Sequence, residues 1–292
     1  MEEHHTPAAI VAAVGPAARQ ETAALIAQGR TWDAAGWEAA SWCTGWSVRD
    51  VVAHLTESTE RFGLQTRAAV AGEPVPEFSP VEREARRQQC KALPPAVLLD
   101  ELERRVEAFF TYVEALPAEA LARPVVPFVA GRLAPYQVAQ LRLNELALHR
   151  WDIRAPREPA ATLEPHVAAL VVDFVLAGVP RLARAEALAS LQAVFHCVAT
   201  GPGGGSMTLA CRAGAAEARR GAPATADAVL TLPTEALVRL VWGRLPLARA
   251  LADGTVAVSG GPGAEPAAAR ERVLALGRVF GNPEAGVREE RR

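Results

Sequence analysis

Three residues have types and spacings that could bind a catalytic metal ion. His54 lies in the segment GWSVRDVVAHL, and Glu145 and His149 lie roughly ninety residues later in LRLNELALHRWDI. In both segments these polar residues fall on the apolar face of an amphipathic helix. Two imidazoles and one carboxylate form a three-ligand metal site, which leaves one coordination position open for a reactant. The pattern predicts a metalloenzyme.

The spacing of Glu145 and His149 places both side chains on one helix face, one turn apart. Such a pair also occurs as a surface ion pair, and a single histidine such as His54 also occurs as a hydrogen-bonded core residue. An uncompensated carboxylate inside a bundle is costly, and a bound cation removes that cost. The interior position of all three residues therefore favours ligation.

Further polar residues near these three could join the site. Asp50 lies one turn before the first histidine, but with Ser47 it forms a capping-box pattern, which favours a role at the helix start. Asp152 follows His149 by three residues, and we expect it to support that ligand or the helix end. Cys43 could be a nucleophile or an extra ligand, but packing is the usual role of a free cysteine.

Amphipathic segments that would position these side chains predict a four-helix bundle. The predicted helices cover residues 7–29, with a break or second start at Gly15–Pro16, then 48–71, 95–115 and a fourth from Pro135 onward. Bundles build metal sites from inward side chains on facing helices. The connections TWDAAGWEAASWCTGW, GEPVPEFSP and LPAEALARPVVPFVAGRLAP are expected to be irregular.

The second part of the chain has a different sequence pattern, in which short strand-like segments alternate with helical ones. Residues 155–165 are rich in Pro and Ala, and we place a domain boundary there, with a bundle over 1–157 and a smaller α+β domain over 158–292. Its expected helices are residues 164–186, TEALVRLVWGR and EPAAARERVLALGRVF, and its expected strands are LQAVFHCVAT, SMTLACRAG, ADAVLTL and GTVAVSG. The segment GPGGGS lacks the ending of a phosphate-binding loop and is expected to form a hairpin.

GWSVRDVVAHL and NELALHRWDI resemble the two motifs of the mycothiol-dependent maleylpyruvate isomerase family. Members of this family combine a DinB-like metal-binding four-helix bundle with a sterol-carrier-like domain. The resemblance implies a site for zinc, or a similar divalent metal ion, formed by His54, Glu145 and His149, and it implies mycothiol or another low-molecular-weight thiol as cofactor. Thr44 departs from the family pattern, in which many relatives have Pro.

ADAVLTLPTEALVRLVWGR and ADGTVAVSG resemble the family's C-terminal domain. The motif that ends in Arg244 implies a guanidinium that holds a substrate carboxylate, although a cation here could equally complement a helix end.

The chemistry implied is cis–trans isomerisation of an electrophilic unsaturated small molecule by thiolate addition. The same groups without elimination would make a mycothiol S-transferase. Two other classes remain open: a thiol-independent enzyme that uses zinc-bound water, and a binding protein with a structural metal and an apolar ligand in the second domain.

Composition limits the partners. The net charge of −2 gives no electrostatic support for nucleic-acid binding. MEEHHTPAAI has no apolar region typical of a secretory signal, and VAALVVDFVLAGV is expected to be too short to span a bilayer. Four scattered cysteines are typical of a reduced cytosolic protein. We therefore expect a cytoplasmic monomer or homodimer that acts on a small molecule, without nucleic-acid or membrane partners.

Overall fold

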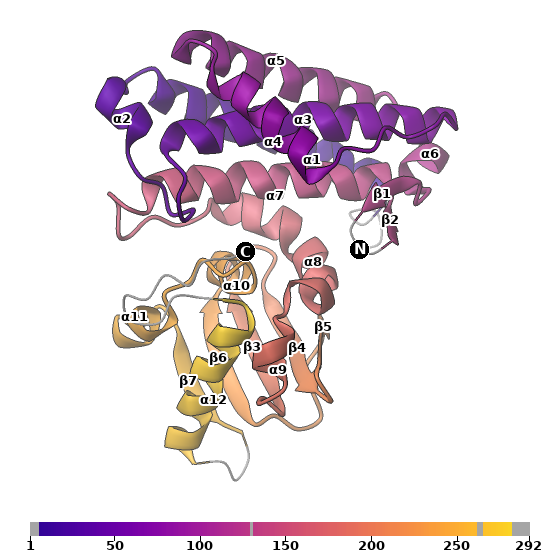
Figure 1. The fold of residues 1–292 in the computed structure, drawn as a ribbon. Helices are drawn as coiled ribbons and strands as arrows, with labels where there is room; N and C mark the ends of the chain where they lie inside the picture. The colour runs from indigo at the N-terminus through magenta and orange to yellow at the C-terminus, as the bar shows by residue number, and fades with distance from the viewer. Residues whose placement is uncertain (1–5, 129–130, 262–264, 282–292) are drawn as a thin grey trace. The chain divides into compact units, whose positions relative to one another are not determined.

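The structure is a computed structural model, which describes residues 6–128, 131–261 and 265–281. The chain divides into two compact units, Met1–Ala161 and Thr162–Arg292, each drawn in Figure 1. The division falls a few residues after the boundary expected between 157 and 158. The charged C-terminal segment VREERR lies outside the described residues.

Unit 1 is a helical bundle with a small hairpin. Its elements are α1 (Pro7–Gly29), α2 (Ala34–Glu38), α3 (Val48–Ala71), α4 (Pro80–Lys91), α5 (Pro95–Glu114), α6 (Ala118–Ala122), β1 (Val126–Phe128), β2 (Gly131–Leu133) and α7 (Pro135–Arg154). The long helices α1, α3, α5 and α7 pack against one another (Figure 1). The expected four-helix bundle is therefore confirmed.

Helix α1 corrects one expectation, because it runs unbroken through Gly15 and Pro16. A proline inside a helix removes one backbone hydrogen bond, but the helix is held here by buried Val14 and Ala18. Gly15 continues the helix instead of breaking it. A Cβ atom at this position would meet the end of the flexible Glu114 side chain, which is paired with Arg19 of α1.

Helix α4 was not expected, because its segment PVEREARRQQCK is mostly polar. It begins with a capping box of Ser79 and Glu82, which the sequence carries as an S-x-x-E pattern. Cys90 is its one buried residue. Without an apolar stripe there was no periodic signal for this helix.

Helix α7 is buried on most of its surface, so its sequence shows little separation of polar and apolar faces. Leu141, Leu143 and Ile153 are almost fully buried, and so are the polar residues Arg142 and Asp152. Buried polar groups require partners. The partners of these two residues form the candidate site.

Unit 2 is an α+β fold, as expected. Its strands are β3 (Ala193–Thr200), β4 (Gly205–Arg212), β5 (Ala215–Arg220), β6 (Ala228–Pro233) and β7 (Ala257–Gly260), and its helices are α8 (Pro165–Leu182), α9 (Ala185–Leu188), α10 (Thr234–Val241), α11 (Leu247–Ala252) and α12 (Pro266–Val279). The sheet order is β5-β4-β3-β6-β7, with β3 and β6 parallel and the other pairs antiparallel. The GPGGG segment joins β3 and β4, with Ala199 opposite Gly205. The expected hairpin is thus confirmed.

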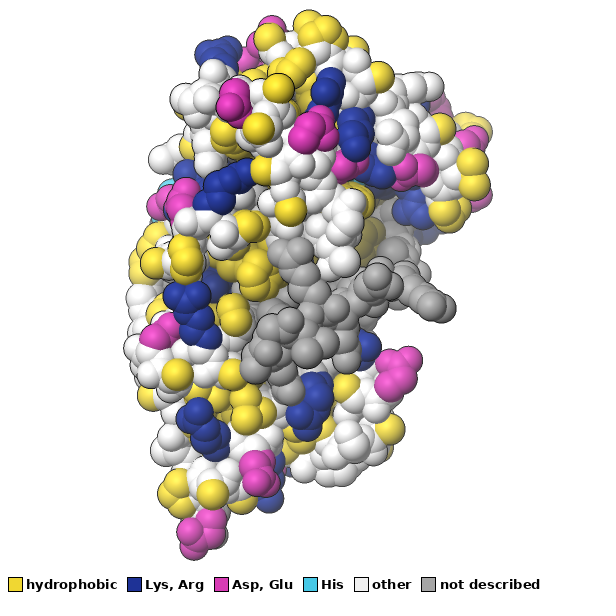
Figure 2. Space-filling view, turned by 60° about the vertical axis from the view of Figure 1, so that its left-hand side comes forward, with side chains coloured by type: hydrophobic (Ala, Val, Ile, Leu, Met, Phe, Trp, Pro, Cys, Tyr) yellow, Lys and Arg dark blue, Asp and Glu magenta, His cyan; other side chains and the backbone are white. Residues whose placement is uncertain are grey.

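Strand β5 was missed because AAEARR is polar and forms an edge strand with little burial. Over the face drawn in Figure 2, charged side chains of both signs are interspersed with apolar ones.

Helix α8 is long and apolar enough, by length and composition, to cross a membrane, although its apolar stretch was expected to be too short. A single such helix is weak grounds for a membrane span, because core helices of soluble proteins share these properties. Helix α8 packs against α10 and β5, and it buries Val167, Val171 and Val175.

Candidate metal centre

The start of α3 fixes the position of His54. Ser47 caps the helix, and its backbone N–H donates to Asp50 Oδ2 at 3.1 Å. Val51 and Leu55 are fully buried on the same helix and anchor it in the bundle. His54, between them in the sequence, is held at the edge of the core with 24% of its side chain exposed.

His54, Glu145 and His149 come together in the structure, as the sequence predicted. One candidate ligand atom from each residue lies within 4.8 Å of the others. His54 Nε2 is 3.7 Å from Glu145 Oε2, and the two imidazole rings are 4.9 Å apart between centroids. All three side chains are half-buried. Metal ligation itself remains a prediction.

Asp152 contacts His149, the residue that it was expected to support. The His149 Nδ1 atom lies 2.8 Å from Asp152 Oδ2, and Asp152 is fully buried. A carboxylate at Nδ1 favours the tautomer with the ring proton on that atom, in which Nε2 would be the nitrogen that binds a metal ion. The thiol of Cys43 donates to the same carboxylate oxygen at 3.2 Å. Packing was the favoured role for Cys43, and its contact with Asp152 was not foreseen.

Arg142 is the main residue of the site that the sequence interpretation missed. Its side chain has no exposed surface, and its NH1 group donates to Glu145 Oε2 at 2.6 Å. Its NH2 group donates to Thr59 Oγ1 of α3 at 2.9 Å. Its spacing could have indicated this role, because Arg142 lies three residues before Glu145 and therefore on the same helix face.

The Glu145 carboxylate is held ionised by this environment. Burial alone raises its pKa, but the charge of Arg142 and the interactions with His54 and His149 lower it more, so the net pKa is well below the usual value. A deprotonated carboxylate is the form that binds a metal ion.

Asp50 has a structural role instead of a ligand role. It forms ion pairs with Arg87 and Lys91 of α4, in addition to its capping contacts. Burial raises the pKa of Asp50, but the hydrogen bonds from Lys91, Ser47 and Arg87 lower it further, to about 2. The carboxylate therefore ties α4 to the start of α3.

Trp46 lines the site next to His54. The centroids of their rings are 5.2 Å apart, and the guanidinium carbon of Arg87 lies 4.7 Å from the centroid of the indole. Trp46 therefore lies between the His54 ring and the guanidinium group of Arg87.

Arg244 belongs to unit 2, just after α10. Gly243 has a left-handed backbone conformation with φ of 68°, which ends the helix and turns the chain. The backbone N–H of Arg244 then donates to Arg239 O at 2.7 Å, and its NH1 group donates to Trp242 O at 3.0 Å. Its role toward a substrate remains a prediction.

Comparison with known proteins supports the resemblance seen in the motifs. Residues 18–154 match the family described as mycothiol maleylpyruvate isomerase N-terminal domain, and residues 176–264 match the SCP-2 sterol transfer family. The comparison with curated proteins found no match.

Two solved structures share the fold, one described as the mycothiol-dependent maleylpyruvate isomerase and the other as a variant of it in which a histidine is replaced by alanine. Each has a TM-score of 0.57 and covers 80% of this chain and 89% of its own, at 18% and 17% identity respectively. The protein is thus a helical bundle followed by an SCP-2-like domain. Its bundle matches the family described as mycothiol maleylpyruvate isomerase N-terminal domain, in agreement with the resemblance of the sequence motifs.

Proposed function

We propose that the protein is a thiol-dependent enzyme of the maleylpyruvate isomerase type, with mycothiol or a related thiol as cofactor and a divalent metal ion, most simply zinc, held by His54, Glu145 and His149. The observation that carries the proposal is the convergence of these three side chains within a bundle of this family. The donor set fits zinc, since it offers two imidazoles, an ionised carboxylate and a buried carboxylate behind one imidazole.

The bound ion would lower the pKa of a thiol at its open position, so that a thiolate exists at neutral pH. Addition of a thiolate to a cis double bond makes that bond single, and elimination after rotation returns the thiol and the trans product. The chain's own groups have distinct tasks. Asp152 keeps the proton on His149 Nδ1, Arg142 holds the Glu145 carboxylate in place, and Arg244 would hold a substrate carboxylate and stabilise enolate charge.

Metal analysis of purified variants tests the site. We expect about one zinc ion per chain in the wild type and none retained in His54→Ala or His149→Ala, because two ligands bind zinc poorly. His166→Ala, at an exposed position at the start of α8, is the matched control and should keep the metal. Stoichiometric zinc in both ligand variants would place the metal elsewhere.

Turnover assays with and without thiol test the chemistry. With maleylpyruvate as trial substrate, we expect isomerisation that depends on added mycothiol. A stable conjugate in place of the trans product would indicate an S-transferase, and full turnover without any thiol would favour zinc-bound water as the reactive group.

A further inference from the structure

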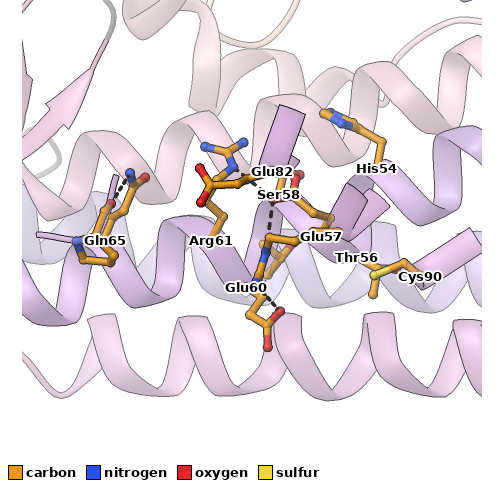
Figure 3. Close-up of polar contacts among 12 residues, drawn as sticks. His54, Thr56, Glu57, Ser58, Glu60, Arg61, Gln65, Glu82 and Cys90 are labelled. Atoms are coloured by element: carbon orange, nitrogen blue, oxygen red, sulfur yellow. Dashed lines mark hydrogen bonds and ion pairs between the residues drawn. The ribbon is translucent and has the colours of Figure 1, made fainter. Parts of the chain in front are cut away.

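Arg61 presents N–H groups near the candidate metal centre that no acceptor in the described part of the chain satisfies. It follows His54 by seven residues on α3, which is close to two full helical turns and so the same face. Figure 3 shows both side chains on one side of α3, with Glu60 on the opposite side.

The guanidinium of Arg61 is held in place from one end. Its Nε donates to Glu57 Oε1 at 3.2 Å, and Glu57 is itself 4% exposed and lies 3.8 Å from Arg86 Nε. The Arg61 side chain is 12% exposed, and its guanidinium carbon lies 4.5 Å from the centroid of the Phe62 ring. No other hydrogen bond or ion pair of Arg61 occurs among the described residues. The two terminal nitrogens therefore keep their four N–H donors for another acceptor.

Arg61 also lies within electrostatic reach of the candidate ligands. Arg142 lies over the same Phe62 ring, at 5.7 Å, and the charges of Glu145 and Arg142 both act on Arg61. Arg142 donates hydrogen bonds to Glu145 and Thr59. The terminal nitrogens of Arg61, in contrast, have no such partner among the described residues.

Neither terminal nitrogen of Arg61 is among the fully buried unpaired atoms of the described residues, so both are accessible to a bound anion. Burial of the rest of the side chain lowers the pKa of Arg61. A divalent ion at the three ligands would add positive charge to this region and increase the preference for an anion.

We propose that Arg61 binds a carboxylate of the substrate through its terminal N–H groups. This inference rests on the proposed function, and it adds a carboxylate-binding residue from unit 1 to it. The planar fork of arginine suits bidentate carboxylate binding, and the contact with Glu57 presets its orientation. Arg61 is thus a specificity-determining residue in unit 1.

Titration calorimetry with maleate, in the absence of thiol, tests this assignment. We expect Arg61→Gln to weaken maleate binding about thirtyfold, the scale of charge-assisted hydrogen bonds. Arg61→Lys should recover little, because an ammonium cannot reproduce the fork. Arg67→Gln makes the same change on the exposed side of α3 and should bind maleate as the wild type does. Maleamide, which is uncharged, should bind weakly to all of these proteins.

Zinc content and melting curves are measured on every variant. These measurements distinguish failure of the proposed metal site from failure of the proposed carboxylate binding by Arg61. A wild type without zinc that still binds maleate through Arg61 would refute the metal proposal and keep this one. If Arg61→Gln fails to fold, the maleate affinity of Arg61→Lys tests the assignment instead. This variant is expected to fold, because it keeps a positive charge beside Glu57. No maleate binding by the wild type, or wild-type affinity in the folded Arg61 variants, would overturn the assignment.

Discussion

His149 has the most closely defined surroundings of the three candidate ligands. Its Nδ1 atom faces the fully buried Asp152, and the Cys43 thiol donates to that same carboxylate. The carboxylate favours the tautomer with the proton on Nδ1 and orients the imidazole, and the thiol helps to compensate the buried carboxylate. This arrangement matches the outer support that metal-binding histidines usually have.

Asp152→Asn should weaken zinc binding by roughly 10- to 100-fold, the usual cost of losing such a support. An amide can no longer hold the Nδ1 proton as strongly, so the ring is less well oriented. Competition with a chromogenic chelator measures the affinity. Asp173→Asn, at a half-exposed carboxylate paired with Arg220, is the control. A folded Asp152→Asn protein with wild-type zinc affinity would contradict the support role.

Arg142→Met should destabilise the zinc-free protein by roughly 3 kcal/mol, because it leaves the Glu145 carboxylate without its buried counter-charge. Saturating zinc should restore part of this loss, since the ion would then neutralise the carboxylate and stabilise the folded state by binding. Urea unfolding with chelator and with zinc measures both effects. Arg150→Met breaks another buried pair on α7, with Glu21, and its cost should not depend on zinc.

The candidate ligands could be predicted from sequence because their identity and helical spacing suffice to place them on inward faces. Arg142 and Arg61 could not, because a long polar side chain on a helix usually reaches solvent. Their burial follows from partners on another helix or turn, such as Thr59 and Glu57, and sequence alone does not show which polar groups will meet.

At the scale of elements, the start of α3 is the point on which the site depends. Asp50 closes the capping box and pairs with Arg87 and Lys91 of α4. Arg87 also lies over Trp46, which contacts His54. The polar helix α4 therefore supports the candidate site through one carboxylate and one indole ring.

Asp50→Asn should lower the free energy of unfolding at neutral pH by about 2 kcal/mol, the equivalent of a pKa shift from 3.8 to about 2. The folded-state pKa is depressed, so this stability is present above pH 4 and is lost as the pH falls through about 2. The difference between variant and wild type should shrink over that window in urea titrations. Glu82→Gln changes the capping box of α4 at an exposed position. It should lower the free energy of unfolding by less than Asp50→Asn does. A constant difference from pH 7 to pH 2 would contradict this account.

Element prediction succeeded where apolar periodicity was strong. Helices α3 and α5 follow the expected ranges closely, because Val51, Leu55 and Phe62 or their counterparts recur at helical spacing. Helix α4 and strand β5 lack such residues, and their stability comes from capping, ion pairs and neighbouring strands. The Gly15–Pro16 pair was misinterpreted because tertiary packing outweighs the lost hydrogen bond.

At the scale of the whole molecule, the two-part organisation and the α+β class of unit 2 were predictable. The sequence changes from long helical patterns to mixed strand and helix patterns after a Pro- and Ala-rich segment. The strand order was not, because the parallel pairing of β3 with β6 joins strands separated by β4 and β5. The three candidate metal ligands belong to unit 1, and Arg244 belongs to unit 2.

Arg244→Ala should lower kcat/KM by roughly a hundredfold, the scale of one charge-stabilising donor, and leave zinc content unchanged because no candidate ligand is altered. The side chain has a backbone partner in Trp242 O, but loss of that contact should cost only about 1 kcal/mol of stability. Arg244→Lys should recover little activity, since a point charge cannot bind a carboxylate bidentately.

Arg249→Ala, at an exposed position on α11, is the control for charge alone. Steady-state kinetics, metal analysis and melting curves of the three variants together separate catalysis from folding. Unchanged kinetics, or unfolding that accounts for all the lost activity, would limit Arg244 to ending α10.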